Sequence, residues 1–183
     1  EKLAERYRNA KEELFNPCAS AHTMTFNTNI EQQVYLVSEE RKGPLLRYLL
    51  KNKYTGQVLV FASSVDRADK VGNKLNKNGV SCGIIHRKKS QGARNQALQN
   101  FKSKDVSVLV STDLLARGID IAFLPYVINY ELPRSPKDFI HRIGRTGRAE
   151  NPGIAITLIT PEELPHFKVI LKKMKAHVDL IKT

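Results

Sequence analysis

The chain has 183 residues, which suits one domain, and 41% of them are hydrophobic, enough to form a core. No apolar run approaches the roughly 18 to 20 residues of a membrane-spanning helix, and the charged first residues do not resemble a secretory signal. The net charge of +12 favours a polyanionic partner, either nucleic acid or an anionic membrane surface, with solubility alone as the alternative. Cys18 and Cys82 lack a Cys or His at metal spacing and indicate reduced thiols.

The first part of the chain combines a helical pattern with a weakly patterned stretch. Residues 2–15 repeat apolar side chains at helical spacing, and Asn16-Pro17 ends that segment. Residues 16–31 carry the least pattern in the chain and indicate a linker.

Beyond this stretch, apolar runs of strand length alternate with amphipathic helices. Pro44 is expected to open the first helix, Asn78-Gly79 to end the second, and Ser90 and Ser135 to cap the next two. This alternation predicts right-handed crossovers and an α/β fold with a mainly parallel sheet covered by helices on both faces. The expected strands are 32–37, 58–62, 81–86, 106–110, 126–130 and 154–159, and the last helix is expected from Thr160 to about Val178.

Polar clusters follow several of these strands, and ligands of parallel α/β sheets collect at the carboxyl ends of strands. The first cluster, residues 111–120 (STDLLARGID), follows the strand 106–110. In it, Thr112 could contact a phosphate and Asp120 could accept hydrogen bonds from a ribose hydroxyl, while Gly118 permits close backbone approach. A polar loop with an Asp N-cap and a structural Arg–Asp pair is the alternative.

The second cluster, residues 141–148 (HRIGRTGR), contains three arginines. Arg142, Arg145 and Arg148 recur every third residue, so we expect them to project from related sides of a helix and its end. Guanidinium groups match phosphate oxygens, and an arginine finger stabilises charge on a transferring γ-phosphate. A solvated basic face is the alternative, but it leaves unexplained two glycines that each weaken a helix by about 1 kcal/mol.

The third cluster, residues 86–94 (HRKKSQGAR), joins a strand end to a helix start. Backbone N–H groups and the helix dipole favour anions there, and a nucleic-acid backbone would suit the surrounding cations. A plain surface charge run would look similar.

Together these segments resemble the second RecA-like domain of the DEAD-box ATP-dependent RNA helicases of superfamily 2, over about residues 30–178. Motifs V and VI in the right order and spacing make the resemblance highly specific. The matching segments are 112–120 (motif V), 141–148 (identical to a common form of motif VI), 58–64 (motif IV) and the Q-x-x-R element at Gln91 and Arg94.

The resemblance implies roles for individual residues. Arg145 and Arg148 would be catalytic arginine fingers, and Gly118 and Asp120 would bind ATP. No metal ligand is implied in this chain. The implied RNA-binding residues are Arg94, Thr112, Gln91 and Ser64, and His141, Arg142 and Arg117 would couple the two domains through interdomain or intersite contacts.

The resemblance also implies a RecA-like three-layer sandwich at 32–183, with 1–17 as the tail of a preceding domain and 18–31 as the linker. The implied enzyme is an RNA-stimulated ATPase that unwinds duplexes, with ATP and Mg²⁺ held mainly by an N-terminal RecA-like lobe. No Walker A sequence, G-x-x-x-x-G-K-[ST], and no D-E-A-D run occurs in the sequence, so the chain is expected to be an incomplete fragment, inactive alone. The expected partners are RNA and that lobe, and no membrane partner is expected. The protein is expected to be a monomer. The expected location is cytoplasmic, or nuclear or nucleolar in a eukaryote.

Other functions remain open on the sequence. The missing Walker A loop favours a module that binds RNA or protein without catalysis. A dinucleotide-binding enzyme domain is disfavoured because G-x-G-x-x-G follows no strand. A DNA-directed superfamily 2 helicase stays open, since phosphate contacts do not distinguish the two sugars.

Overall fold

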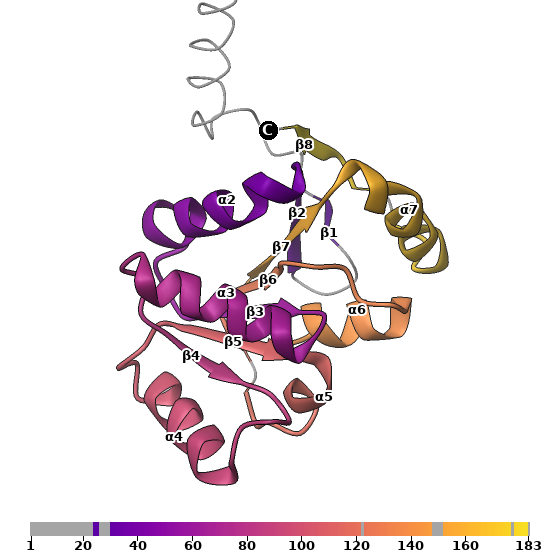
Figure 1. Cartoon of the computed structure of the whole chain (residues 1–183). Coiled ribbons are helices and arrows are strands. Elements are labelled where there is room, and N and C mark those ends of the chain that lie inside the picture. Colours follow the sequence, from indigo (N-terminus) through magenta and orange to yellow (C-terminus); the bar gives the residue numbers. More distant parts are fainter. Residues whose placement is uncertain (1–23, 26–29, 122, 148–151, 177, 183) are drawn as a thin grey trace, which may run out of the picture.

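The computed structural model describes residues 24–25, 30–121, 123–147, 152–176 and 178–182 (Figure 1). The predicted helix at 2–15 and the predicted tail at 1–17 lie outside these residues. The predicted linker at 18–31 is described only in part, so its boundaries stay predictions.

The described strands form one sheet of eight, which is parallel except where β1 pairs with β2. Seven of them follow the order β1-β2-β7-β6-β3-β5-β4, and β8 also pairs with β2, in parallel register. This confirms the predicted α/β fold with a mainly parallel sheet. The strands are β1 (Met24–Thr25), β2 (Ile30–Leu36), β3 (Val58–Ala62), β4 (Cys82–Ile85), β5 (Val108–Thr112), β6 (Tyr126–Asn129), β7 (Gly153–Ile159) and β8 (Leu180–Lys182).

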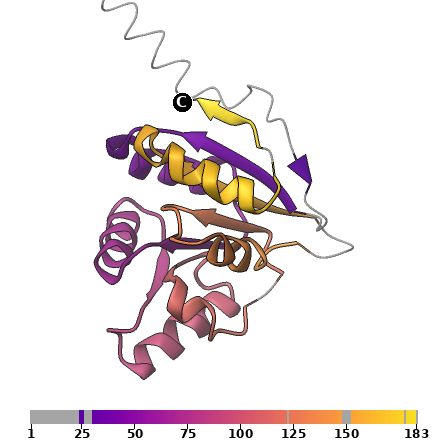
Figure 2. The same cartoon turned by 90° about the vertical axis from the view of Figure 1, so that its right-hand side faces the viewer.

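Helices cover both faces of this sheet, as Figures 1 and 2 show. One face packs under α2 (Glu39–Asn52) and α3 (Val65–Lys77), through Leu46, Leu49 and Leu75. On the other face, Phe139 and Phe167 lie with their ring centroids 6.1 Å apart. That face carries α4 (Gln91–Lys102), α5 (Asp113–Ala116), α6 (Pro136–Ile143), the 3₁₀ turn η1 (Pro161–Glu163) and α7 (Leu164–Lys173).

The alternation of side chains along the central strands explains the three layers. In β3, Val58 and Val60 belong to the core under α2 and α3, whereas Leu59 and Phe61 belong to the core under α4 and α5. Every residue of β3 is therefore buried, which is the physical reason why its sequence is a continuous apolar run. Among the described residues, no helix is long and apolar enough to cross a membrane.

The predicted caps are confirmed. The Ser90 and Ser135 hydroxyls accept hydrogen bonds from the backbone N–H groups of Ala93 and Asp138, at 3.2 and 3.1 Å. Gly79 ends the second helix with φ of +79°, a conformation that glycine adopts without steric cost.

Several predicted boundaries are wrong. The helix expected from Pro44 begins at Glu39, after Ser38 in extended conformation at the N-cap position, and two acidic residues in its first turn suit the helix dipole. The third buried strand begins at Val108 rather than Val106 and continues through Thr112, so the first polar residues of the 111–120 cluster belong to the sheet. The last helix ends at Lys173, five residues before Val178.

Gly72 of α3 offers a test of how closely this helix packs on the sheet. A Cβ atom at Gly72 would overlap Cγ1 and Cδ1 of Ile84 in β4. We expect Gly72→Val to lower the free energy of unfolding by about 1–3 kcal/mol, measured by urea denaturation, because overpacking forces neighbours to shift. Gly92→Ala in α4 is the control, since nothing lies within 4 Å of its added Cβ. Equal stability of Gly72→Val and the parent chain would contradict this packing.

Candidate functional site

The residues that the sequence predicts to bind RNA lie at the carboxyl edge of the sheet. In the order β3-β5-β4, Ser64 follows β3, Thr112 ends β5, and Gln91 and Arg94 lie in the helix after β4. The Thr112 side chain makes no capping bond to α5, although it stands at the N-cap position. Ser64 caps α3 by accepting from the backbone N–H of Arg67 at 3.2 Å, which leaves its own O–H free to donate. The fold thus brings these four residues, far apart in sequence, to neighbouring strand ends.

The start of α4 presents Arg94 without a fixed protein acceptor. Its Nε atom is buried and has no hydrogen-bond partner among the described residues. The Gln91 amide binds Asn95 Oδ1 at 2.8 Å, one turn along the same helix. An anion at this helix start would supply the acceptor that Arg94 lacks.

The 86–94 cluster is partly neutralised by its neighbour α3. His86, buried at the end of β4, lies 2.8 Å from Asp69 Oδ1, and Lys89 Nζ lies 3.5 Å from the same oxygen. The hydrogen bond with His86 is the main cause that lowers the pKa of Asp69 below its ordinary value. His86 and Lys89 therefore serve local structure, whereas Arg87 is exposed and forms no ion pair among the described residues.

Arg142 is almost completely buried and holds several elements together. Its Nε and Nη2 atoms bind the two carboxylate oxygens of Asp113 in α5, at 2.5 and 2.7 Å. Its Nη1 atom donates to the backbone carbonyl of Glu131, after β6, at 2.5 Å. The guanidinium carbon also lies 5.0 Å from the centroid of the Phe61 ring in β3. Any effect of Arg142 on a second domain must therefore pass through the groups that it holds in this one.

Arg142 and Arg145 of the 141–148 cluster differ in exposure, since Arg142 is buried and Arg145 is partly exposed, but both line one small cavity. The expectation that all three arginines project from related sides stays a prediction. Helix α6 ends at Ile143, and Arg145 lies in the turn that follows. The two glycines are not helix-interior residues: Gly144 caps α6, and Gly147 has φ of +77°. The argument that they weaken a helix at a site therefore does not hold. Arg148 lies outside the described residues, so its role stays a prediction.

Arg145 is joined to the loop that carries Asp120. Its Nη1 atom donates to the carbonyls of Ile119 and Ile121, at 3.2 and 3.1 Å. These carbonyls flank Asp120, whose side chain is exposed. A guanidinium thus binds the backbone on both sides of an acidic residue from a distant part of the sequence.

Beyond Arg145 the chain leaves the carboxyl edge of the sheet, although the Arg145 side chain itself lines a small cavity with Asp113, the residue after β5. Thr146 pairs with Leu124, which lies just before the start of β6, and its hydroxyl donates to the carbonyl of Leu124. A Cβ on Gly153, the first residue of β7, would overlap Thr146 and Gly147. Because a crossover helix returns the chain to the start of the next parallel strand, the end of the 141–148 cluster lies near the amino ends of β6 and β7.

Arg117 and His141 complete the surface near Arg142. Arg117 is half-exposed and forms an ion pair with Asp138, in the first turn of α6. His141 is exposed. Gly118 has only one neighbour near an added Cβ, the Leu115 carbonyl at 3.7 Å, so the structure itself does not require glycine there. A small cavity of about 10 Å³ is lined by Phe61, Asp113, Ala116, Arg117, His141, Arg142 and Arg145.

The sequence did not single out the network around Glu131. This buried carboxylate accepts from the Ser63 hydroxyl and from Arg67 Nε, the latter at 2.7 Å, and Arg67 also pairs with Glu39. An acid directly after a buried strand was the available signal, but only the fold shows its partners. Among the described residues, no group of three or more His, Cys, Asp or Glu is placed to hold a metal ion.

Comparison with known families gives this arrangement its context. The family described as the helicase conserved C-terminal domain matches residues 41–150, which include all three polar clusters and the whole of α4. The chain belongs to this family. The resemblance drawn from the motifs is thereby confirmed: this is a C-terminal RecA-like domain of the kind found in DEAD-box RNA helicases.

The curated relatives carry helicase names. The DEAD-box ATP-dependent RNA helicase CshA of Geobacillus kaustophilus is 35% identical over 99% of this chain, and the match covers 38% of that protein. The ATP-dependent RNA helicase ROK1 of Eremothecium gossypii is 38% identical over 84% of this chain and 27% of that protein. The chain therefore spans well under half the length of these relatives.

Solved structures show the same fold. A DEAD-box protein from Methanococcus jannaschii aligns with a TM-score of 0.76 and 35% identity, over 98% of this chain and 48% of that one. The E. coli DEAD-box protein SrmB, bound to regulator of ribonuclease activity A, aligns with a TM-score of 0.76 and 31% identity, over 82% and 88% of the two chains. The C-terminal domain of Dbp5 aligns with a TM-score of 0.76 and 28% identity, over 86% and 91%.

The buried position of Arg142 predicts a large structural cost for its removal. Arg142→Ala would leave the Asp113 carboxylate and the Glu131 carbonyl without this donor, and breaking such a pair typically costs about 3–5 kcal/mol of unfolding free energy. Arg117→Ala is the control, because its ion pair is half-exposed and is expected to contribute less than about 1 kcal/mol. Chemical denaturation of both variants measures the difference, and similar small losses would contradict the assigned role.

Proposed function

We propose that this chain acts as the C-terminal lobe of an ATP-dependent RNA helicase, contributing an arginine finger and part of the RNA-binding track. The observation that carries the proposal is the bond from Arg145 to the two carbonyls that flank Asp120. A donor for phosphate oxygens and an acceptor for a ribose hydroxyl are thereby held at one place, as a nucleotide site requires.

The groups present fit ATP. Arg145 is anchored through Nη1 alone, so Nη2 and Nε have no protein acceptor among the described residues and can donate to a phosphate. The exposed Asp120 carboxylate can accept from a ribose hydroxyl, with Gly118 beside it. Bound ATP would supply the γ-phosphoryl group, and Mg²⁺, held mainly by an N-terminal lobe, would neutralise its charge. Arg148 is the second proposed finger, on sequence grounds.

The RNA track in this proposal follows the carboxyl edge of the sheet. Ser64, Thr112, Gln91 and Arg94 would contact the sugar-phosphate backbone, and the net charge of +12 favours such a partner. Arg142 lies between the two regions, because it binds Asp113, the residue after Thr112, and stands on the helix that leads to Arg145. Arg117 and His141, at the surface beside it, would take part in coupling to the N-terminal lobe.

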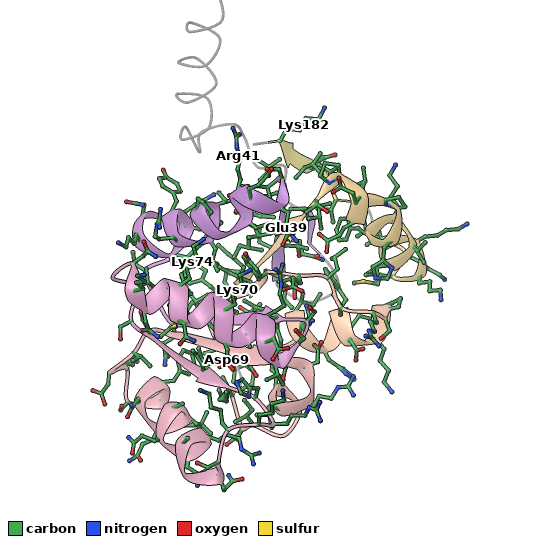
Figure 3. All side chains as sticks on the ribbon, in the orientation of Figure 1. Glu39, Arg41, Asp69, Lys70, Lys74 and Lys182 are labelled. Carbon is green, nitrogen blue, oxygen red and sulfur yellow. The ribbon has the colours of Figure 1, made fainter. Side chains whose placement is uncertain are left out.

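The Arg145 assignment predicts a loss of turnover without a loss of folding. With the chain combined with the N-terminal lobe of a CshA relative, RNA-stimulated ATP hydrolysis should fall by roughly 10³-fold or more in Arg145→Ala. Arg41→Ala is the control, because Arg41 is an exposed arginine on α2 (Figure 3). Near-parental ATPase activity in Arg145→Ala would remove Arg145 from the mechanism. If the parent pair itself shows no RNA-stimulated hydrolysis, the catalytic reading gives way to a binding module.

The Arg94 assignment predicts a change in salt dependence. Arg94→Ala should weaken binding of a single-stranded oligouridylate and reduce the slope of log K against log salt by about 1, because one phosphate contact is lost. Lys102→Ala, at the other end of α4, is the matched control for a lost positive charge. Fluorescence anisotropy at several salt concentrations measures both, and an identical slope in the two variants would contradict a direct phosphate contact.

A further inference from the structure

A groove between α2 and α3 lies on the face of the sheet opposite α6 and α7. Its cavity volume is about 300 Å³, at the lower end of the range of ligand-binding pockets. Leu46, Val71 and Leu75 form an apolar floor, and each of them is also part of the buried core. None of the residues assigned above to ATP or RNA lines this groove, so the proposed function leaves it without a role.

The groove is open because α2 carries a glycine where it faces α3. A Cβ on Gly43 would have only the Lys74 Nζ and Tyr130 Oη atoms near it, both at 3.9 Å. Gly43 lies inside a helix, where glycine is less favourable than alanine by roughly 0.5–1 kcal/mol. Because Gly43 has no side chain, the space above the apolar floor stays free.

The walls of the groove carry positive charge that the protein does not neutralise. Lys70 and Lys74 lie one turn apart on the side of α3 that faces α2, whereas Asp69 points away (Figure 3). Neither lysine has an ion-pair partner among the described residues, and like charges at this spacing repel. Arg47, on the α2 side, donates to the neutral side-chain amide of Asn78 at 2.9 Å and has no ion pair within the part of the chain that the structure describes.

The negative charges of the groove are confined to one end. Glu39 and Glu40 stand in the first turn of α2, and Glu39 already pairs with Arg67. The remaining length of the groove is therefore cationic. At its floor, burial raises the pKa of Tyr130 to about 12, so its hydroxyl remains protonated and can donate a hydrogen bond.

We propose that this groove docks an acidic peptide segment of a partner protein, with one large apolar or aromatic side chain on the Leu46–Val71–Leu75 floor. Acidic residues on either side of that anchor would pair with Lys70, Lys74 and Arg47. The combination of one apolar anchor with flanking charges is how proteins commonly recognise a short segment. This inference does not depend on the proposed ATP and RNA sites.

The test uses the whole 183-residue chain and two variants that change the groove in different ways. Lys70→Glu/Lys74→Glu reverses the wall charge. Gly43→Leu fills the cavity while improving helix propensity. The matched control is Lys168→Glu/Lys172→Glu on α7, which reverses two exposed lysines at the same spacing and gives the same net charge. Circular dichroism and thermal melting verify that each variant folds.

The probe is a short fluorescein-labelled peptide of Glu, Asp and Ser with one central Phe, and its twin has Ser in place of Phe. Saturable binding to the parent chain is expected, weakened about tenfold or more in both groove variants and little changed in the control. The Phe-free twin should bind more weakly to the parent chain. RNA-stimulated ATPase activity with the N-terminal lobe should be unchanged in both groove variants, which separates this inference from the proposed function.

Four results would overturn the proposal. The first is that the peptide does not bind saturably to the parent chain, and the second is that the α7 control weakens binding as much as the groove variants do. The third is that the Phe-free twin binds with the same affinity. The fourth is that single-stranded RNA displaces the peptide and the groove variants also lose RNA binding. The last result would make the groove part of an RNA surface instead of a protein-docking site.

Discussion

The guanidinium of Arg142 fixes the relative positions of the elements from which the candidate site is built. It binds α5 through Asp113, the end of β6 through the Glu131 carbonyl, and the face of Phe61 in β3. A buried cation is tolerated only when its donors are satisfied, and here each of its three nitrogens has an acceptor. If α5 or the end of β6 moved away from Arg142, either the Arg142 charge or the Glu131 carbonyl would be buried without a partner. The segments that carry Asp113 and Glu131 are therefore held in one relative position.

Because Arg142 holds these elements in place, the proposed RNA-binding surface and the proposed nucleotide-binding surface are connected through α6. The carboxyl edge carries Thr112 and Arg94, while Arg145 binds the backbone on both sides of Asp120 and precedes Thr146, which pairs just before the start of β6. Helix α6 spans the distance between them, and Arg142 ties its last turn to the residue after Thr112. In the proposed helicase, a change at the RNA edge would reach the nucleotide residues through this helix, because Arg142 links its last turn to Asp113.

On the face under α2 and α3, contacts between neighbouring elements explain why a groove is present. The Glu39–Arg67–Glu131 network joins the two helices, and the buried Lys42 ties α2 to η1 by binding Glu163 at 2.8 Å. These contacts fix the helices near their N-termini, whereas the missing side chain of Gly43 leaves the space between them unfilled farther along. The groove is thus a consequence of rigid neighbours and a missing side chain, and does not require a mobile segment.

The sequence by itself determined the fold class, the order of the elements and the identity of the motifs. Continuous apolar strands, capped helices and the segments 112–120 and 141–148 are local patterns, and local patterns suffice for these conclusions. The tertiary structure decided where the arginines lie: Arg142 inside, and Arg145 on the carbonyls beside Asp120. Spacing along the chain could not show this. Helix α6 stops at Ile143, before Arg145, and the burial of Arg142 depends on Asp113, which lies 29 residues away in the sequence. The same reason explains why the Glu131 network and the α2–α3 groove were missed, since both are made by residues that meet only when the sheet is assembled.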